Sequence, residues 1–274
     1  MKEDARDARS AMLLGGIALV RGDGAAGAKW LERAVALAPG DAQARWWLGR
    51  AYARQLARAG RLAQIRIAGR LRETLERAIA LDPSLVEARV DLMRFYLVAP
   101  GVVGGGTDKA RAQAREIAKL SAWRGRLAAG AVAEKERDGA RAEREYRAAV
   151  VAAPDSVDGY LALGAMYERA GEWDHAFALY DTLRTRTKAA VAHYQLGRAA
   201  SLSGRELARG ARALEEYVNG APEPGDPSLA SGWYRLGLVY EKQGDRARAR
   251  QAFERVLALD AKQGDAREAL DRMR

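Results

Sequence analysis

Apolar residues recur along the chain in stretches that have the three- and four-residue spacing of amphipathic helices. The stretches come in pairs, in which the first stretch often contains Leu-Gly and the second often ends at a proline. The Leu-Gly dipeptides begin at Leu14, Leu48, Leu163, Leu196 and Leu236. Their glycines are 34 positions apart from Gly15 to Gly49 and 33 apart from Gly164 to Gly197. The pattern therefore predicts a helical hairpin that repeats about every 34 residues.

The residue types in the repeated unit predict how its two helices cross. Two helices can approach closely where a small residue of one faces a large residue of the other. We expect the glycine at the eighth place of the repeat to face the large second-helix residues Tyr146, Tyr180, Leu214 and Phe253. Small second-helix residues serve the same close approach at Gly27, Ala110, Ala142, Ala176, Gly210 and Ala249. Proline cannot continue a helix, so second helices should end just before Pro39, Pro83, Pro154 and Pro222.

The unit resembles the tetratricopeptide repeat, whose pattern is W-x2-L-G-x2-Y, then A-x3-F and a proline over 34 residues. The clearest copy contains Tyr160, Leu163, Gly164, Tyr167, Gly171, Trp173, Ala176 and Tyr180. The last copy contains Trp233, Leu236, Gly237, Tyr240, Gly244, Ala249, Phe253 and Val256. The resemblance covers almost the whole chain and implies an all-α, right-handed α-solenoid of about seven stacked helix pairs, because stacking buries the apolar face that one hairpin leaves exposed.

Counting in register predicts a single solenoid domain over residues 1–274. Repeats are expected at 8–41, 42–85, 86–122, 123–156, 157–189, 190–224 and 230–263, followed by a capping helix at 264–274. The second repeat carries about ten extra residues, which we expect to lengthen both of its helices. The third repeat has Met93 in place of the usual glycine, and the segment 99–106 interrupts it. Glycines 104–106 precede Thr107, which we expect to be the N-cap of a helix. Free amide groups at the start of that helix could bind an anion, although the negative charge of Asp108 would repel one.

The chain carries a net charge of +10, and 38 of its 46 basic residues are arginine. Segment 42–72 contains no acidic residue and eight arginines, at positions 45, 50, 54, 58, 61, 66, 70 and 72. Aromatic residues lie among these arginines, so one alternative function is binding of nucleic acid or an anionic surface through residues 45–72. An arginine-rich composition, with abundant alanine and glycine, explains the same charge without selection for phosphate binding.

The residue inventory argues against catalysis. Without cysteine the chain has no disulfide, thiol nucleophile or cysteine-ligated metal, and only His175 and His193 could supply an imidazole. Residues 22–27, GDGAAG, match a dinucleotide-binding pattern, and Asp41 follows at about the ribose-binding distance. Gly22 nevertheless falls in the turn inside a repeat, which favours a structural role over a dinucleotide-dependent enzyme. We expect no catalytic residue, no metal and no cofactor.

No membrane span is expected, because the longest apolar run, residues 11–20, is about half of the ~20 residues that a transmembrane helix needs. The charged residues before it sum to zero, which argues against a signal peptide. The sequence is compatible with a cytoplasmic or an exported location and does not indicate an oligomeric state.

In the family that the chain resembles, first helices line a concave surface through positions 2, 5, 9, 12 and 13 of each repeat. Carried onto this sequence, these positions give the candidate partner-binding residues Gln43, Trp46, Arg50, Arg54, Arg94, Tyr194, Arg198 and Tyr234. Tryptophan, tyrosine and arginine dominate binding hot spots. Of the adjacent Trp46 and Trp47, we expect only one to point into the core. The resemblance therefore implies a non-catalytic scaffold that binds an extended or helical, acidic segment of another protein.

Overall fold

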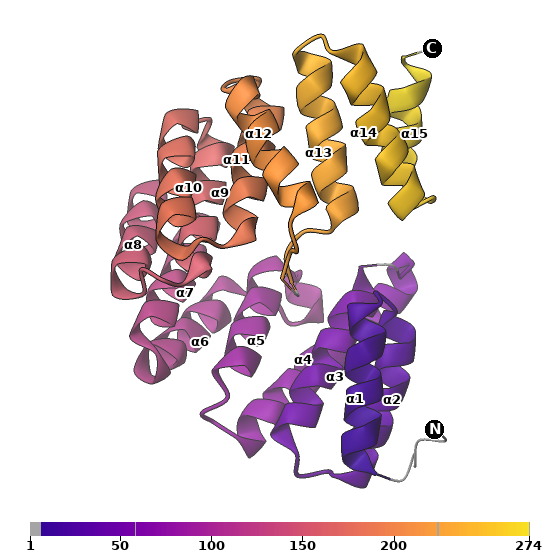
Figure 1. The fold of residues 1–274 in the computed structure, drawn as a ribbon. Coiled ribbons are helices and arrows are strands. Elements are labelled where there is room, and N and C mark those ends of the chain that lie inside the picture. Colours follow the sequence, from indigo (N-terminus) through magenta and orange to yellow (C-terminus); the bar gives the residue numbers. More distant parts are fainter. Residues whose placement is uncertain (1–6, 58, 224, 274) are drawn as a thin grey trace. The chain divides into compact units, whose positions relative to one another are not determined.

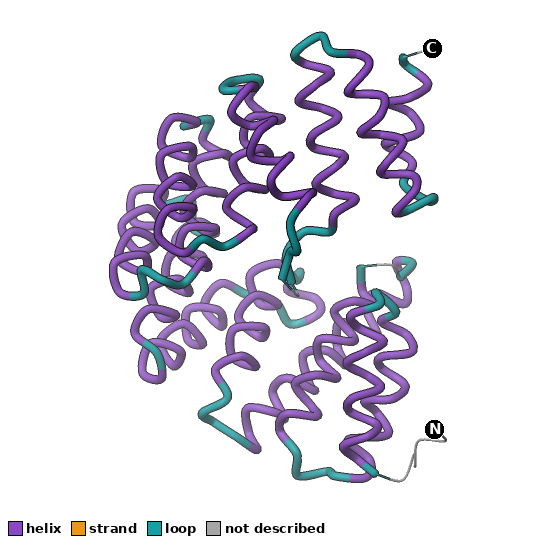
Figure 2. Tube along the Cα trace, in the orientation of Figure 1, coloured by secondary structure: helices purple, strands orange, loops and turns teal. Residues whose placement is uncertain are grey.

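The computed structural model describes residues 7–57, 59–223 and 225–273, and within these residues it consists of α-helices, one short 3-10 helix and connecting loops (Figures 1 and 2). Helices α1 to α8 belong to one compact unit, Met1–Ala152, and α9 to α15 belong to a second, Ala153–Arg274. The sequence-based expectation of a single domain over residues 1–274 stays a prediction.

The first unit contains α1 (Ala8–Val20), α2 (Gly24–Leu37), α3 (Ala42–Leu56), α4 (Arg61–Leu81), α5 (Val86–Val98), the 3-10 helix η1 (Gly101–Val103), α6 (Thr107–Leu120), α7 (Ala122–Lys135) and α8 (Gly139–Ala152). The second contains α9 (Val157–Ala170), α10 (Trp173–Thr187), α11 (Ala190–Ser203), α12 (Leu207–Asn219), α13 (Leu229–Lys242), α14 (Arg246–Leu259) and α15 (Gly264–Asp271).

Consecutive helices pack as pairs, from α1 with α2 to α13 with α14, and α15 packs against α14. First helices of neighbouring pairs also touch, as α1 touches α3, α3 touches α5, and α11 touches α13. The described residues thus contain seven helix pairs and a closing helix, which confirms the predicted all-α helical-repeat fold.

The predicted helix crossings are present. A methyl group added to Gly164 would lie 2.5 Å from Tyr180 Cζ, and one added to Gly237 would lie 2.6 Å from Phe253 Cε1. The glycines at 130 and 197 are covered in the same way by Tyr146 and Leu214. Real side-chain carbons do not approach this closely, so glycine at these positions is what allows the large residue to lie across the first helix.

The second repeat differs from the expectation that both of its helices are longer. Helix α3 has 15 residues, whereas α4 has 21, so the added length lies in α4 and the connection before it. Gly60, with extended backbone, stands at the N-cap of α4. The first turns of α4 expose Leu62 and Ile65 to solvent, at 88% and 57% of their surface.

Glycines 104–106, just before α6, use their amide groups in hydrogen bonds within the chain. Gly104 donates to Gly101, Gly105 to Pro100 and Gly106 to the Tyr96 carbonyl oxygen, at 2.9, 3.1 and 2.9 Å. The expectation that Thr107 is an N-cap is wrong, because Thr107 is the first helical residue and Gly106 holds the cap position. The amides of these three glycines are therefore used by the chain itself and are not free to bind an anion.

The glycine-rich residues 22–27 form the turn between α1 and α2, as the repeat register predicts. Gly22 has φ 79° after the end of α1. The Asp23 side chain then caps α2 by accepting hydrogen bonds from the amides of Ala25 and Ala26, at 3.1 and 2.9 Å. In the described chain no strand precedes this turn, so the dinucleotide-binding arrangement is not formed.

Buried tyrosines bind glutamates on neighbouring helices. Between repeats, the hydroxyl groups of Tyr52 and Tyr96 donate to Glu32 and Glu76, each at 2.8 Å. In the last repeat Tyr240 donates to Glu215 in the same way. Burial, followed by this hydrogen bond, raises the pKa of Tyr240 to about 12. The neutral phenol is therefore the form that the fold stabilises.

The raised tyrosine pKa predicts a loss of stability in alkaline solution. Above pH ~10 tyrosine ionises in the unfolded chain but stays protonated in the fold, so the free energy of unfolding should fall as the pH rises toward about 12. Urea unfolding followed by circular dichroism at a series of pH values measures this fall. The Tyr240→Phe protein should lose stability less steeply, and an identical slope would contradict the assignment.

Candidate partner-binding site

A cavity of about 660 Å³ opens in the first unit between the first helices α3 and α5, with α4 behind them. We call it the α3–α5 pocket. Its apolar lining comes from Leu56, Leu71, Leu75, Phe95 and Val98, and its charged lining from Arg50, Arg54, Asp91 and Arg94. Leu71, Leu75 and Phe95 are buried, whereas the three arginines are exposed. The pocket thus has an apolar base and a basic mouth.

The two walls of the pocket follow from helical spacing. Residues 50, 53, 54 and 57 of α3 and its C-terminal turn, and residues 91, 94, 95 and 98 of α5, line it at i, i+3, i+4 and i+7, which is one face of each helix. On the α3 wall, Ala53 and Ala57 alternate with the arginines. Because alanine ends at Cβ, these two positions leave open the space that a larger side chain would occupy.

The charged groups at the mouth are partly held by their neighbours. Trp46 Nε1 donates to Asp91 Oδ2 at 2.8 Å, and Arg94 Nη1 lies 3.7 Å from Asp91 Oδ1. The Arg50 guanidinium lies over both Trp46 and Trp47, 5.3 and 4.9 Å from the ring centroids. Within the described residues no carboxylate lies within 4.0 Å of Arg50 or Arg54. Both guanidinium groups therefore keep N–H donors for an external acceptor.

The structure brings together three of the predicted partner-binding residues, Arg50, Arg54 and Arg94, in the α3–α5 pocket. Gln43 is exposed near the start of α3, outside the pocket lining. The expectation for the tryptophan pair is wrong, because Trp46 and Trp47 are both half-buried against the same core, with ring centroids 5.0 Å apart. Each ring packs partly against the core and partly against the Arg50 guanidinium.

The other predicted residues belong to the second unit and make contacts of their own. Tyr194 is only 8% exposed, with its ring 5.3 Å from that of Tyr217. Arg198 binds Glu168, and the half-buried Tyr234 lies 5.8 Å from the Phe253 ring. Tyr194 and Arg198 thus have structural partners. Their role in partner binding stays a prediction.

Sequence reasoning missed Asp91 and the apolar base of the pocket. The signal was available in α5, where Asp91, Arg94, Phe95 and Val98 share one helical face. Val98 is 79% exposed, which is unusual for a valine at the end of a helix whose other apolar residues are mostly buried. What could not be read from the spacing is that the facing α3 wall would carry two alanines and leave a cavity.

Part of the arginine-rich segment 45–72 is engaged within the chain. Arg45 donates to the Pro39 carbonyl oxygen at 2.8 Å, and Arg70 binds Glu32 at 2.7 Å and lies over the Tyr52 ring. Arg72 lies 3.8 Å from Glu76. Arg58 lies outside the described residues. These contacts reduce the number of guanidinium groups that could neutralise the phosphates of a nucleic acid.

The part of the chain that is described offers no arrangement for metal or acid–base chemistry at this pocket. Its lining contains no serine, threonine, histidine or lysine, and a group of three or more metal-binding side chains is absent from the described residues. None of the described helices is both long enough and apolar enough to cross a membrane. The pocket can bind an apolar side chain and, at its mouth, carboxylate oxygens.

Comparison with known proteins supports the repeat assignment. A family model described as tetratricopeptide repeat matches residues 230–263, the last helix pair. Yeast Tom70 is similar in structure, with a TM-score of 0.74 and 13% identity over 99% of this chain and 55% of that chain. A tetratricopeptide repeat protein from Parabacteroides merdae has a TM-score of 0.55 and 13% identity over 97% and 98% of the two chains.

Cut9, in a hetero-tetramer with Hcn1, has a TM-score of 0.55 and 15% identity over 98% of this chain and 50% of that chain. The chain therefore spans about half of the Tom70 and Cut9 chains that it matches. A search of curated proteins found no match. At these identities the structural likeness concerns the fold.

Proposed function

We propose that the chain, which is built from helix pairs of the tetratricopeptide repeat type, is a non-catalytic scaffold that binds an acidic segment of another protein at the α3–α5 pocket. Protein–protein interaction is the general role of the tetratricopeptide repeat fold. Cut9, which has the same fold, is found in a complex with another protein. The observation that carries the proposal is the pocket itself, in which an apolar base lies beneath three arginines.

The apolar base supplies most of the affinity in this proposal. Its volume of about 660 Å³ lies within the usual range for ligand pockets, and an inserted apolar or aromatic side chain would lose its contact with water. Interfaces depend on a few such buried anchors, whereas the surrounding contacts mainly exclude water. The partner segment should therefore carry one large apolar residue that fits between α3 and α5.

The arginines select the charge of the residues around that anchor. Arg50 and Arg54 have no carboxylate within 4.0 Å among the described residues, and Arg94 is 71% exposed with only a long contact to Asp91. Guanidinium groups bind carboxylates through paired hydrogen bonds, which are stronger than those between neutral groups. Aspartate or glutamate beside the anchor would therefore be favoured, and lysine or arginine would be repelled.

Reversing two charges at the mouth should abolish this interaction. In the Arg50→Glu, Arg94→Glu protein the mouth would repel an acidic segment, so a pull-down from native cell extract should lose the partner found by mass spectrometry with the original chain. The melting temperature should change by only a few degrees, because both arginines are exposed and surface contacts of this kind contribute little stability.

A control with the same charge change tests whether position matters. Arg33 on α2 and Arg77 on α4 are exposed and lie outside the pocket. The Arg33→Glu, Arg77→Glu protein should retain the partner. Equal recovery of the partner by both double variants would reject the pocket as its binding site.

A further inference from the structure

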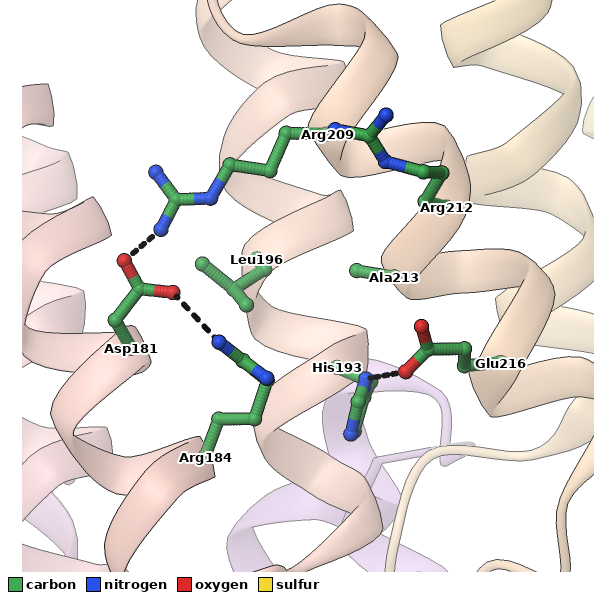
Figure 3. A pocket seen from close by; sticks show the side chains of 8 residues that line it. All are labelled: Asp181, Arg184, His193, Leu196, Arg209, Arg212, Ala213 and Glu216. Atoms are coloured by element: carbon green, nitrogen blue, oxygen red, sulfur yellow. Dashed lines mark hydrogen bonds and ion pairs between the residues drawn. The ribbon is translucent and has the colours of Figure 1, made fainter.

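A second cavity, of about 290 Å³, lies in the second unit between the second helices α10 and α12, over the first helix α11 (Figure 3). We call it the α10–α12 pocket. Its polar lining consists of Asp181, Arg184, His193, Arg209, Arg212 and Glu216. The tetratricopeptide register predicted none of these residues as a binding residue, and the proposed partner-binding site does not use them.

Asp181 organises one side of this cavity. Its carboxylate accepts a hydrogen bond from Arg209 of α12 and lies 3.7 Å from Arg184 Nη2 on its own helix (Figure 3). One carboxylate is therefore shared between two guanidinium groups that come from different helices. The Arg184 contact is too long for a hydrogen bond, so Arg184 keeps its N–H donors for another acceptor.

Arg212 adds a third guanidinium to the α12 edge of the cavity (Figure 3). In the part of the chain that is described, no carboxylate lies within 4.0 Å of it. The other acid of the pocket, Glu216, is directed to His193 instead, with Oε2 2.9 Å from Nδ1. The lining thus contains three guanidinium groups and two carboxylates, and one of those carboxylates lies beside His193.

His193 adds no permanent charge to the pocket. Burial lowers the pKa of its imidazole and Arg184 lowers it further, although Glu216 opposes them. The ring is therefore neutral at pH 7. The arginines carry the charge excess of the pocket.

We propose that the α10–α12 pocket binds a phosphoryl group between Arg184 and Arg212. Such a group carries close to two negative charges and three acceptor oxygens, which match two guanidinium groups that have free donors. The cavity is smaller than most drug-sized ligand sites, so it suits a single anionic group. Asp181 holds Arg209 across the cavity and competes with the ligand for Arg184.

Calorimetric titration of the full chain with inorganic phosphate tests the site. Removing one of two charged donors to the ligand should weaken binding about tenfold or more, so we expect this loss in both Arg184→Gln and Arg212→Gln. Arg246→Gln provides a matched control, because Arg246 is exposed at the start of α14, outside the pocket. Absence of phosphate binding, or equal binding by all three variants, would overturn the proposal.

A variant that should strengthen phosphate binding, rather than weaken it, separates an effect on the ligand from damage to the fold. Asp181→Asn removes the competing carboxylate and releases Arg184, so it should strengthen phosphate binding several-fold. The Arg184 and Arg209 side chains, which would lose this carboxylate, are 43% and 31% exposed, so neither would be left as a fully buried charge. Unchanged or weaker binding by a folded Asp181→Asn protein would contradict the arrangement.

A phosphoserine peptide, titrated beside its unphosphorylated form, identifies the source of the phosphoryl group. Tighter binding of the phosphopeptide than of inorganic phosphate would assign the pocket to a phosphorylated protein segment. Equal affinities would assign it to the free anion. Either result supports the site, provided that Arg212→Gln weakens the binding. If the unphosphorylated peptide binds as tightly as the phosphopeptide, the site is rejected.

Discussion

Arg198→Met is expected to destabilise the second unit by about 3 to 5 kcal/mol, the usual cost of removing one partner from a buried ion pair. Arg198 of α11 donates to Glu168 of α9, and the Glu168 side chain is only 4% exposed. Glu168 also accepts the Tyr180 hydroxyl at 3.0 Å. Without Arg198, the buried carboxylate would lose its ion-pair partner and keep the neutral Tyr180 hydroxyl as a donor. Urea unfolding followed by circular dichroism measures the loss.

The double variant Arg198→Met, Glu168→Gln is the matched control. A glutamine amide still accepts from Tyr180, and no uncompensated charge remains in the core. We expect the double variant to be more stable than Arg198→Met alone, even though it carries one more substitution. If the two losses simply add, the contact is not the reason for the effect.

Gly164→Ala is expected to lower the free energy of unfolding by on the order of 1 to 3 kcal/mol, because overpacking a core displaces side chains from their preferred positions. The added methyl group would lie 2.5 Å from Tyr180 Cζ, and Tyr180 is fully buried. Moving that ring would also disturb its hydrogen bond to Glu168. The same unfolding experiment measures this change.

Gly69→Ala controls for the intrinsic difference between glycine and alanine in a helix. Gly69 lies inside α4, and a methyl group added there meets nothing within 4 Å. This variant should gain about 0.5 to 1 kcal/mol, because alanine is the better helix former. A loss of stability in Gly69→Ala similar to that in Gly164→Ala would show that the Tyr180 contact is not responsible.

The helix crossings could be predicted from sequence because they are local. A glycine and the large residue that covers it lie 16 or 17 positions apart in one hairpin, as with Gly164 and Tyr180, and the same pairing recurs along the chain. The extension of α4 could not be assigned in this way. Amphipathic spacing continues through the inserted residues whichever helix contains them. Only the position of the turn before Gly60 decides which of the two helices is longer.

The candidate site was predicted only in part for a related reason. The register placed Arg50, Arg54 and Arg94 on one face, but the partners of other arginines lie far away in sequence, as Glu168 does from Arg198. An arginine on a predicted binding face can therefore be a structural residue. The α10–α12 pocket was missed because the register directs attention to first helices, whereas its arginines lie on second helices.

The alanines at positions 53 and 57 have a consequence for how such a protein changes its partner. They sit on the α3 wall, where their side chains face open space and no helix crossing depends on them. Exchanging either for valine or leucine would narrow the opening while the backbone and the arginines kept their places. Recognition could then evolve by small steps in side-chain volume, without any cost to the architecture that presents it.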